Sequence, residues 1–313
     1  MISTVISTMV NPVFSWNVVD DIRTMWAYPF MVNAFRAGAV VAIVAGVMGW
    51  FMVLRRQTFA GHTLALSAFP GAAGATLIGI AASYGYFAFC AGAAAVIALA
   101  TRGGRGRATG PASSRVSESA LTGIVQAFTL ACGLLFVALY HGFLNGTTAL
   151  LFGSFLGITA SQVVTLAATA AAVLAVLAAI GRPLLFASVD PDVAAARGVP
   201  VRALSVAFLV LLGAAVAETA QITGALLVFA LLVMPAAAAQ RLTARPAASL
   251  LLTVLIGFLV TWAGLTAAFY SPYPIGFWVT TFAFAVYLAA QAAPALLRLA
   301  RRRATTHLAG APA

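Results

Sequence analysis

The chain has 313 residues, of which 63% are apolar and 7% are charged, and its formal net charge is +11. Soluble domains average about 25% charged residues, so this composition excludes a water-soluble globular protein. The apolar residues form long unbroken runs, which are typical of membrane-spanning helices and not of the alternating strands of a β-barrel. We therefore predict an all-α integral membrane protein, a polytopic helical bundle.

Nine apolar runs are long enough to cross a bilayer. They are residues 37–54, 63–82, 84–100, 120–139, 160–180, 203–217, 221–240, 248–269 and 277–297. The polar sequence ETAQITG at 218–224 separates the sixth run, which is short, from the seventh. We therefore expect nine transmembrane helices, with eight as the alternative.

The seventeen basic residues are all arginines, and they lie in short segments between the apolar runs. This distribution follows the positive-inside rule of membrane proteins and argues against nucleic acid as a partner. Only Arg23 and Arg36 fall on the side opposite the other fifteen. The arginine-rich side is therefore expected in the cytoplasm, which places the amino terminus outside and the carboxyl terminus inside.

This topology divides the chain into three parts. Residues 1–29 form an outer segment, residues 30–298 form the transmembrane domain, and residues 299–313 form a basic cytoplasmic tail that we expect to be disordered. Within the transmembrane domain, the Gly- and Ser-rich residues 102–117 predict a flexible cytoplasmic linker.

The second apolar run contains small residues at helical spacing. Gly71 and Ala75, and Ala75 and Gly79, lie four residues apart on one helical face. Such faces allow helices to pack closely in lipid, and Pro70 beside them predicts a kink. The same features are compatible with packing alone or with a bent helix beside a transport path.

The stretch SVDPDVAAARGVPVR at 188–202 is unusual because it holds two of the six acidic residues of the chain. Asp190 can cap the start of a helix, Pro191 suits the first helical position, and Gly198 suits the left-handed residue that follows its end. Asp192, Val193 and Arg197 would then lie on this helix, the last two on one face. We predict a short, rigid cytoplasmic helix within the segment 188–200.

Polar side chains at membrane depth are few. Glu218, with Gln221 three residues later, and His141 are expected toward the outer side, and Pro235 is expected to break the seventh span near its cytoplasmic end. Each has a purely structural alternative: a helix-end carboxylate, a lone structural histidine or a packing kink. We keep them as candidates for a transport path, but no metal-ligand set can be identified.

The chain contains no lysine, so it lacks the phosphate-binding loop of ATPases. No arrangement of residues supports intramembrane catalysis either. We therefore expect a transport subunit and not an enzyme, with no bound cofactor.

Four stretches resemble the permease subunits of ATP-binding-cassette importers for divalent metals. They are LRRQTFAGHTLALSAFPGAAGA at 54–75, RPLLFASVDPDVAAARGVPVR at 182–202, AETAQITGALLVFALLVMPAAAAQRL at 217–242 and YSPYPIGFWVTTFAF at 270–284. The likeness covers about residues 28–298. One position departs from the pattern: Leu66 stands where many relatives carry a histidine, whereas His62 fills a position where relatives have Asp or His.

The resemblance implies a homodimeric permease in the cell membrane that imports zinc or manganese. It implies that the helix at 190–198 docks on a separate cytoplasmic ATPase subunit, and that an extracytoplasmic metal-binding protein delivers the ion. A different cargo, such as a metal chelate or haem, is one alternative. An ion-coupled secondary transporter is another, although such proteins usually bury several ionisable residues at mid-membrane.

Overall fold

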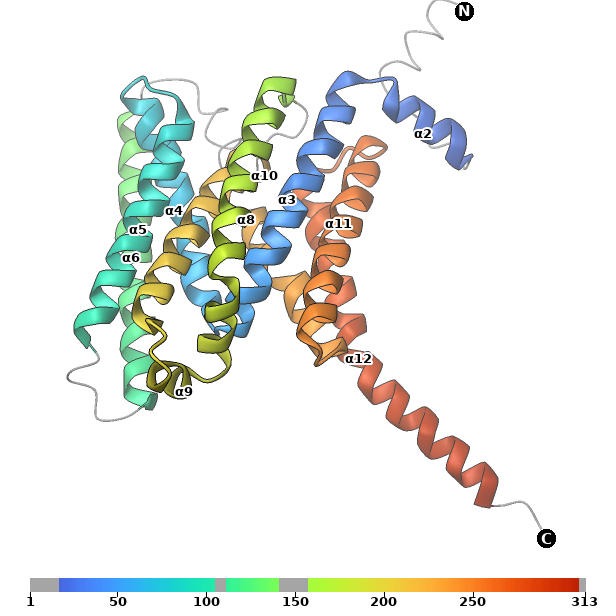
Figure 1. Ribbon diagram of the computed structural model, residues 1–313. Coiled ribbons are helices and arrows are strands. Elements are labelled where there is room, and N and C mark those ends of the chain that lie inside the picture. Colours follow the sequence, from blue (N-terminus) through green and yellow to red (C-terminus); the bar gives the residue numbers. More distant parts are fainter. Residues whose placement is uncertain (1–16, 105–110, 141–156, 310–313) are drawn as a thin grey trace, which may run out of the picture.

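The computed structural model describes residues 17–104, 111–140 and 157–309, which form ten helices and no strand. The helices are α2 (Val18–Trp26), α3 (Pro29–Leu54), α4 (Thr58–Leu77), α5 (Ala82–Gly104), α6 (Pro111–Leu139), α8 (Ala160–Val189), α9 (Pro191–Ala196), α10 (Val201–Leu242), α11 (Pro246–Phe269) and α12 (Ile275–Ala309). The long helices run side by side in one bundle, with α2 at one end and α9 at the other (Figure 1).

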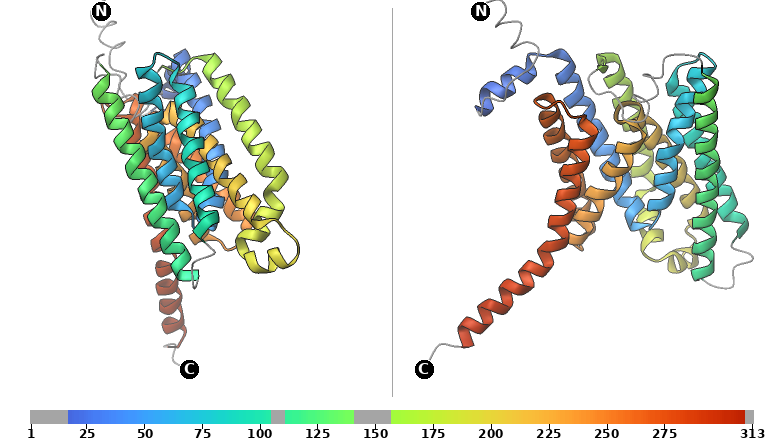
Figure 2. Two further views of the ribbon diagram at one scale, coloured as in Figure 1. Left: turned by 90° about the vertical axis from the view of Figure 1, so that its left-hand side faces the viewer. Right: turned by 180° about the vertical axis from the view of Figure 1, so that it is seen from behind.

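Helices α3 and α10 lie at the centre of this bundle. Helix α10 packs on α3, α4, α5, α8, α11 and α12, whereas α6 contacts α4 and α5 at the periphery. Helices α11 and α12 pack on each other and extend away from the α4–α6 group, which is clearest from behind (Figure 2). The prediction of an all-α polytopic bundle is therefore confirmed.

Helix α10 reverses direction inside the bundle. Arg55 at the end of α3 donates to Ser205 near the start of α10, and Gln240 near the end of α10 donates to the carbonyl of Trp50 at 3.0 Å. Because Trp50 and Arg55 are only about 7–8 Å apart along a helix, both ends of α10 lie at the same end of the bundle. The turn falls at Gly224, whose φ of 76° and ψ of 158° are not helical.

The two halves of α10 correspond to the sixth and seventh predicted spans. Eight segments in the described residues are long and apolar enough to cross a membrane, including Val201–Gln221 and Thr223–Leu242. Helix α4 is not among them by composition, because His62, Thr63 and Ser67 lower its apolarity. It is nevertheless a helix of the bundle, enclosed by α5, α6 and α10. All nine predicted helices are therefore present in the described residues, and eight of them are long and apolar enough to cross a membrane.

Several helices extend beyond their predicted ends. Helix α3 begins at Pro29 instead of residue 37, because proline is well suited to the first turn of a helix. Helices α5 and α6 extend into the predicted linker, and only residues 105–110 of it lie outside the described part. The tail was expected to be disordered, but α12 continues to Ala309. Its alanine-, leucine- and arginine-rich sequence has high helix propensity.

Apart from Arg23 and Arg36, the arginines of the described residues gather at one end of the bundle. The α3–α4 turn, α9, the α10–α11 turn and the C-terminal end of α12 all lie there (Figure 1). At the opposite end, the hydroxyl of Tyr270 donates to the carbonyl of Asp21 in α2 at 3.1 Å. Burial, with Asp21 beside it, raises the pKa of Tyr270, so this hydroxyl remains a donor at neutral pH. The predicted grouping of arginines on one side is confirmed.

Helices α4 and α5 approach each other through glycine. A Cβ added at Gly71 would lie 2.2 Å from the carbonyl oxygen of Gly85, and one added at Gly85 would lie 2.0 Å from that of Gly71. Ala75, one turn along α4, also faces Gly85. The small residues of the second predicted span therefore pack two backbones directly against each other, as expected for close helix pairs in lipid.

Candidate functional site

Helix α9 is a short helix capped at both ends. The Asp190 carboxylate accepts a hydrogen bond from the backbone N–H of Val193 at 3.0 Å, and Pro191 occupies the first turn. At the other end Gly198 has φ +80°, and the N–H groups of Gly198 and Val199 donate to the carbonyls of Ala195 and Ala194, both at 3.0 Å. This is a Schellman motif, which closes a helix with a left-handed residue. The predicted caps are confirmed.

Nearly all of α9 faces outward. Ala194 is the one fully buried residue of the helix, whereas Asp192, Val193 and Arg197 are exposed. Val193 is 46% exposed although it is apolar. The helix therefore presents a mixed apolar and charged surface beyond the ends of the long helices, available to a partner.

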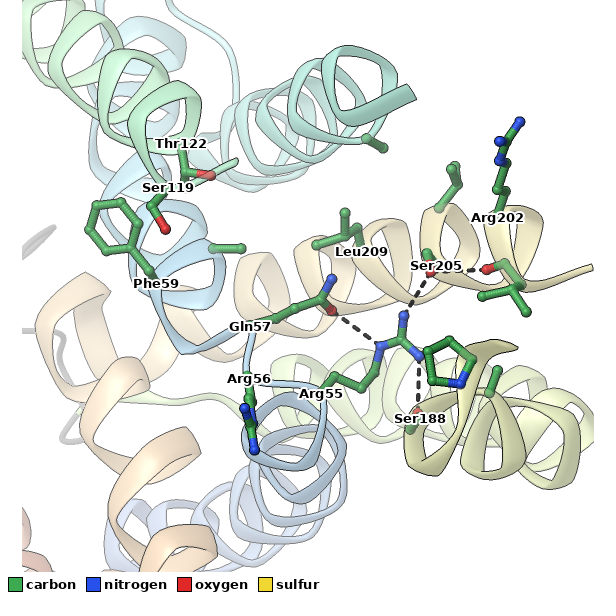
Figure 3. Close-up of a pocket in the computed structure, with 16 residues that line it drawn as sticks. Arg55, Arg56, Gln57, Phe59, Ser119, Thr122, Ser188, Arg202, Ser205 and Leu209 are labelled. Atoms are coloured by element: carbon green, nitrogen blue, oxygen red, sulfur yellow. Dashed lines mark hydrogen bonds between the residues drawn. The ribbon is translucent and has the colours of Figure 1, made fainter. Parts of the chain in front are cut away.

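Arg55 holds the two chain segments that flank α9. Its guanidinium donates to the Ser188 hydroxyl at 3.0 Å and to the Ser205 hydroxyl at 2.8 Å, and its Nε donates to Gln57 at 3.3 Å (Figure 3). It also lies 5.3 Å from the centre of the Phe208 ring. Because Ser188 precedes α9 and Ser205 follows it, one side chain joins both ends of the α9 segment to α3. In the sequence, Arg55 lies within the family-like stretch 54–75 and on the arginine-rich side, but nothing there indicated a role for its side chain.

Replacing Arg55 with alanine is expected to loosen this junction and lower the melting temperature of the purified protein. A hydrogen bond from a charged group contributes about 1.5–3 kcal/mol, and Arg55 makes two short ones across helices. Arg55→Lys should have an intermediate melting temperature, because an ammonium group keeps the charge but cannot reproduce the planar, forked guanidinium. Thermal unfolding in detergent measures the effect, with exposed Arg245→Ala as the control at the same end of the bundle. Unchanged melting of Arg55→Ala would show that the junction is not structural.

Glu218 is the most deeply buried carboxylate of the described residues. It is 2% exposed, and neither carboxylate oxygen has a hydrogen-bond partner. The nearby hydroxyls of Thr219 and Thr223 donate to carbonyls of their own helix. Because an unpartnered buried charge is costly in a membrane, this carboxyl must be neutral or be compensated by a cation. Such a group can bind a passing cation transiently.

The other path candidates lie elsewhere. Gln221 is exposed and bonds to the Ala217 carbonyl at 3.3 Å, so it does not join Glu218 in one cluster. Pro235 is buried, but the helix continues through it, so the break expected at Pro235 is absent. His141 lies outside the described residues. The ring of His62 stacks on Phe229 with centroids 4.5 Å apart.

No group of three or more His, Cys, Asp or Glu side chains that could hold a metal ion occurs among the described residues. The Nδ1 atom of His62 is buried without a partner, and Leu66 lies one turn further along α4. A leucine offers no ligand atom at that position.

Comparison with known proteins identifies the class of this bundle. Residues 27–293 match the ABC 3 transport family. The chain belongs to that family. This membership agrees with the resemblance seen in the sequence and makes the chain a multi-pass permease of the cell membrane. It gives no support to an ion-coupled secondary transporter.

Several members of the ABC 3 transport family are similar over most of their length. The chain is 28% identical over 239 residues to the manganese transport system membrane protein MntC of Halalkalibacterium halodurans, covering 76% of this chain and 78% of that protein. It is 29% identical over 263 residues to the chelated iron transport system membrane protein YfeC of Yersinia pestis, covering 84% and 86%.

A solved structure has the same fold as this ABC 3 family member. The structure of PsaBC from Streptococcus pneumoniae in complex with Fab superposes with a TM-score of 0.74 at 24% identity, covering 87% of this chain and 95% of that chain. The bundle described above therefore has the fold of that chain.

Proposed function

We propose that this chain is the transmembrane subunit of an ATP-driven importer for manganese. The observation that carries the proposal is the capped, exposed helix α9 in a bundle of the ABC 3 transport family. A separate cytoplasmic ATPase would bind α9, because the chain has no lysine with which to build its own phosphate-binding loop. A second copy of the chain and an extracytoplasmic metal-binding protein would complete the importer.

The orientation follows from charge. The end of the bundle that carries α9 and most arginines would face the cytoplasm, by the positive-inside rule. The amino terminus would then lie outside, and α12 would end in the cytoplasm. In this orientation α9 lies where a cytoplasmic ATPase can reach it, and Glu218 lies near the outer end of the first half of α10.

Manganese is favoured over zinc as cargo by two lines of support. The relatives described above are named for manganese and for chelated iron. The chain contains only three histidines and two cysteines, and the charged ligand of α10, Glu218, offers oxygen atoms. Oxygen ligands suit manganese, whereas zinc prefers nitrogen and sulfur. Iron, free or as a chelate, is the second candidate because of the relative from Yersinia pestis.

Whole-cell elemental analysis tests this function. A strain without the gene, in a background lacking other high-affinity manganese uptake, is compared with the same strain carrying the gene back, both under metal limitation. We expect manganese to fall and to be restored, while iron and zinc stay constant. A fall in iron or zinc alone would reassign the cargo, and no change in any metal would refute the importer.

The variant Glu218→Gln tests the path in the same strain. Glutamine keeps the shape of the side chain but cannot offer a carboxylate to a cation, so we expect manganese to remain as low as without the gene, at normal protein amount. Gln221→Ala is the matched control three residues away on the exposed side of α10. Full restoration by Glu218→Gln would remove Glu218 from the path.

A further inference from the structure

A basic cavity lies beside the α9 segment. Its volume is about 410 Å³, and it is bounded by the α3–α4 turn, α5, α6, the α8–α9 junction and the start of α10 (Figure 3). Arg55, Arg56 and Arg202 line it, and none of its lining residues is acidic. Three guanidinium groups around one opening favour an anionic ligand.

Two of these arginines are available to a ligand. Arg56 and Arg202 are exposed and lie at opposite edges of the cavity (Figure 3). Arg56 has a left-handed backbone, with φ 57°, which is uncommon outside glycine and turns its side chain away from that of Arg55. Arg55 itself is fixed in the wall by Ser188 and Ser205.

The start of α10 adds a second positive element. Val201 and Arg202, the first residues of that long helix, line the cavity, and the preceding Pro200 provides no side-chain cap. The N–H of Val201 donates to the Val199 carbonyl at 2.8 Å, whereas the N–H groups that follow it in the first turn carry a partial positive charge and can bind an anion. The same opening therefore collects fixed side-chain charge and backbone donors.

Part of the cavity lining is apolar. Phe59, which is 42% exposed, contributes to it together with Ala98, Val206 and Leu209, and Ser119 and Thr122 lie beside Phe59 (Figure 3). Ala98 belongs to the candidate membrane span Ala82–Leu99. The cavity therefore extends from the apolar part of the spans to the charged ends of the helices. A ligand that fits it has a negative head and an apolar body.

We propose that this cavity binds an anionic phospholipid, with its headgroup at the opening whose edges carry Arg56 and Arg202 and an acyl chain along Phe59. Basic pockets between transmembrane helices at a membrane surface recognise such headgroups. Free phosphate shares the headgroup chemistry but would leave the apolar part of the lining in contact with water. The proposal concerns a lipid and does not depend on which metal the permease carries.

Native mass spectrometry of the full-length chain tests the proposal. The protein is purified in detergent, and dioleoyl phosphatidylglycerol is titrated in parallel with dioleoyl phosphatidylcholine and with inorganic phosphate. Each arginine near an anionic lipid strengthens binding about fivefold, so the double variant Arg56→Gln, Arg202→Gln should bind phosphatidylglycerol about 30-fold more weakly. The matched control is Arg241→Gln, Arg245→Gln, two exposed arginines at the same end but outside the cavity.

Selective binding of phosphatidylglycerol that the first pair removes and the control pair keeps would support the lipid site. Arg56→Lys, Arg202→Lys should retain most of the binding, because the charge remains. Equal binding of both lipids, or equal loss in both variant pairs, would overturn the proposal. Displacement of phosphatidylglycerol by inorganic phosphate would assign the cavity to free phosphate instead.

Discussion

Gly198→Pro is expected to abolish metal uptake while the chain stays in the membrane at normal amount. Gly198 has φ +80°, whereas proline is fixed near −65° and lacks the N–H that Gly198 donates to Ala195. The Schellman motif cannot form, so α9 loses its end and its direction. Gly198→Ala should be milder, with a cost of about 1–2 kcal/mol for the left-handed backbone.

A charge reversal separates docking from folding at the same helix. Asp192→Arg leaves the caps of α9 in place but inverts the charge of an exposed residue, so we expect loss of uptake and of co-purification with an ATPase subunit. Asp20→Arg, an exposed acidic residue of α2 at the opposite end, is the control and should leave both unchanged. If Gly198→Pro and Asp192→Arg both transported metal normally, the docking role of α9 would be wrong.

Gly85→Leu should prevent the protein from folding. A Cβ at Gly85 would meet the Gly71 carbonyl oxygen at 2.0 Å, and a backbone atom cannot move aside as a side chain can. Overpacking typically costs about 1–3 kcal/mol, and here α4 and α5 must part along their length, so the cost should be at the upper end or beyond. Little monodisperse protein should be recovered by size-exclusion chromatography in detergent.

Gly92→Leu is the matched control for this prediction. Gly92 lies on the same helix two turns later, and nothing approaches its Cβ position within 4 Å. A leucine there would extend from an exposed position of the helix surface, so the yield of folded protein should stay normal. Equal yields from both variants would mean that α4 and α5 do not need the close contact.

The local signals in the sequence were sufficient for several elements. Asp190, Pro191 and Gly198 predicted the ends of α9 because caps act within one turn. The small residues around Gly71 likewise predicted close packing. The partner helix could not be named from sequence alone, because nothing local to Gly71 specifies Gly85. That pairing depends on how the whole bundle is arranged.

The reversal of α10 was expected, because the polar run at 218–224 separated the sixth and seventh predicted spans, and the hydrogen bonds of both halves near the end of α3 confirm it. Other long-range features were missed for the same reason as the partner of Gly71. The junction at Arg55 joins residues 133 and 150 positions away, a distance that no periodicity reports. Helix α12 ran past its expected end because composition suggested disorder where intrinsic propensity favoured helix.

Because α10 reverses at Gly224, its first half is a separate straight segment of helix. From Val201 to Glu218 the first half is an unbroken rod about 26 Å long, anchored near its base by Arg55 and separated from the second half by Gly224. A tilt of about 5° at the base would carry the Glu218 end through about 2 Å. A change in the backbone angles of Gly224 would let the first half tilt in this way, while the second half stays packed on α3 through Gln240.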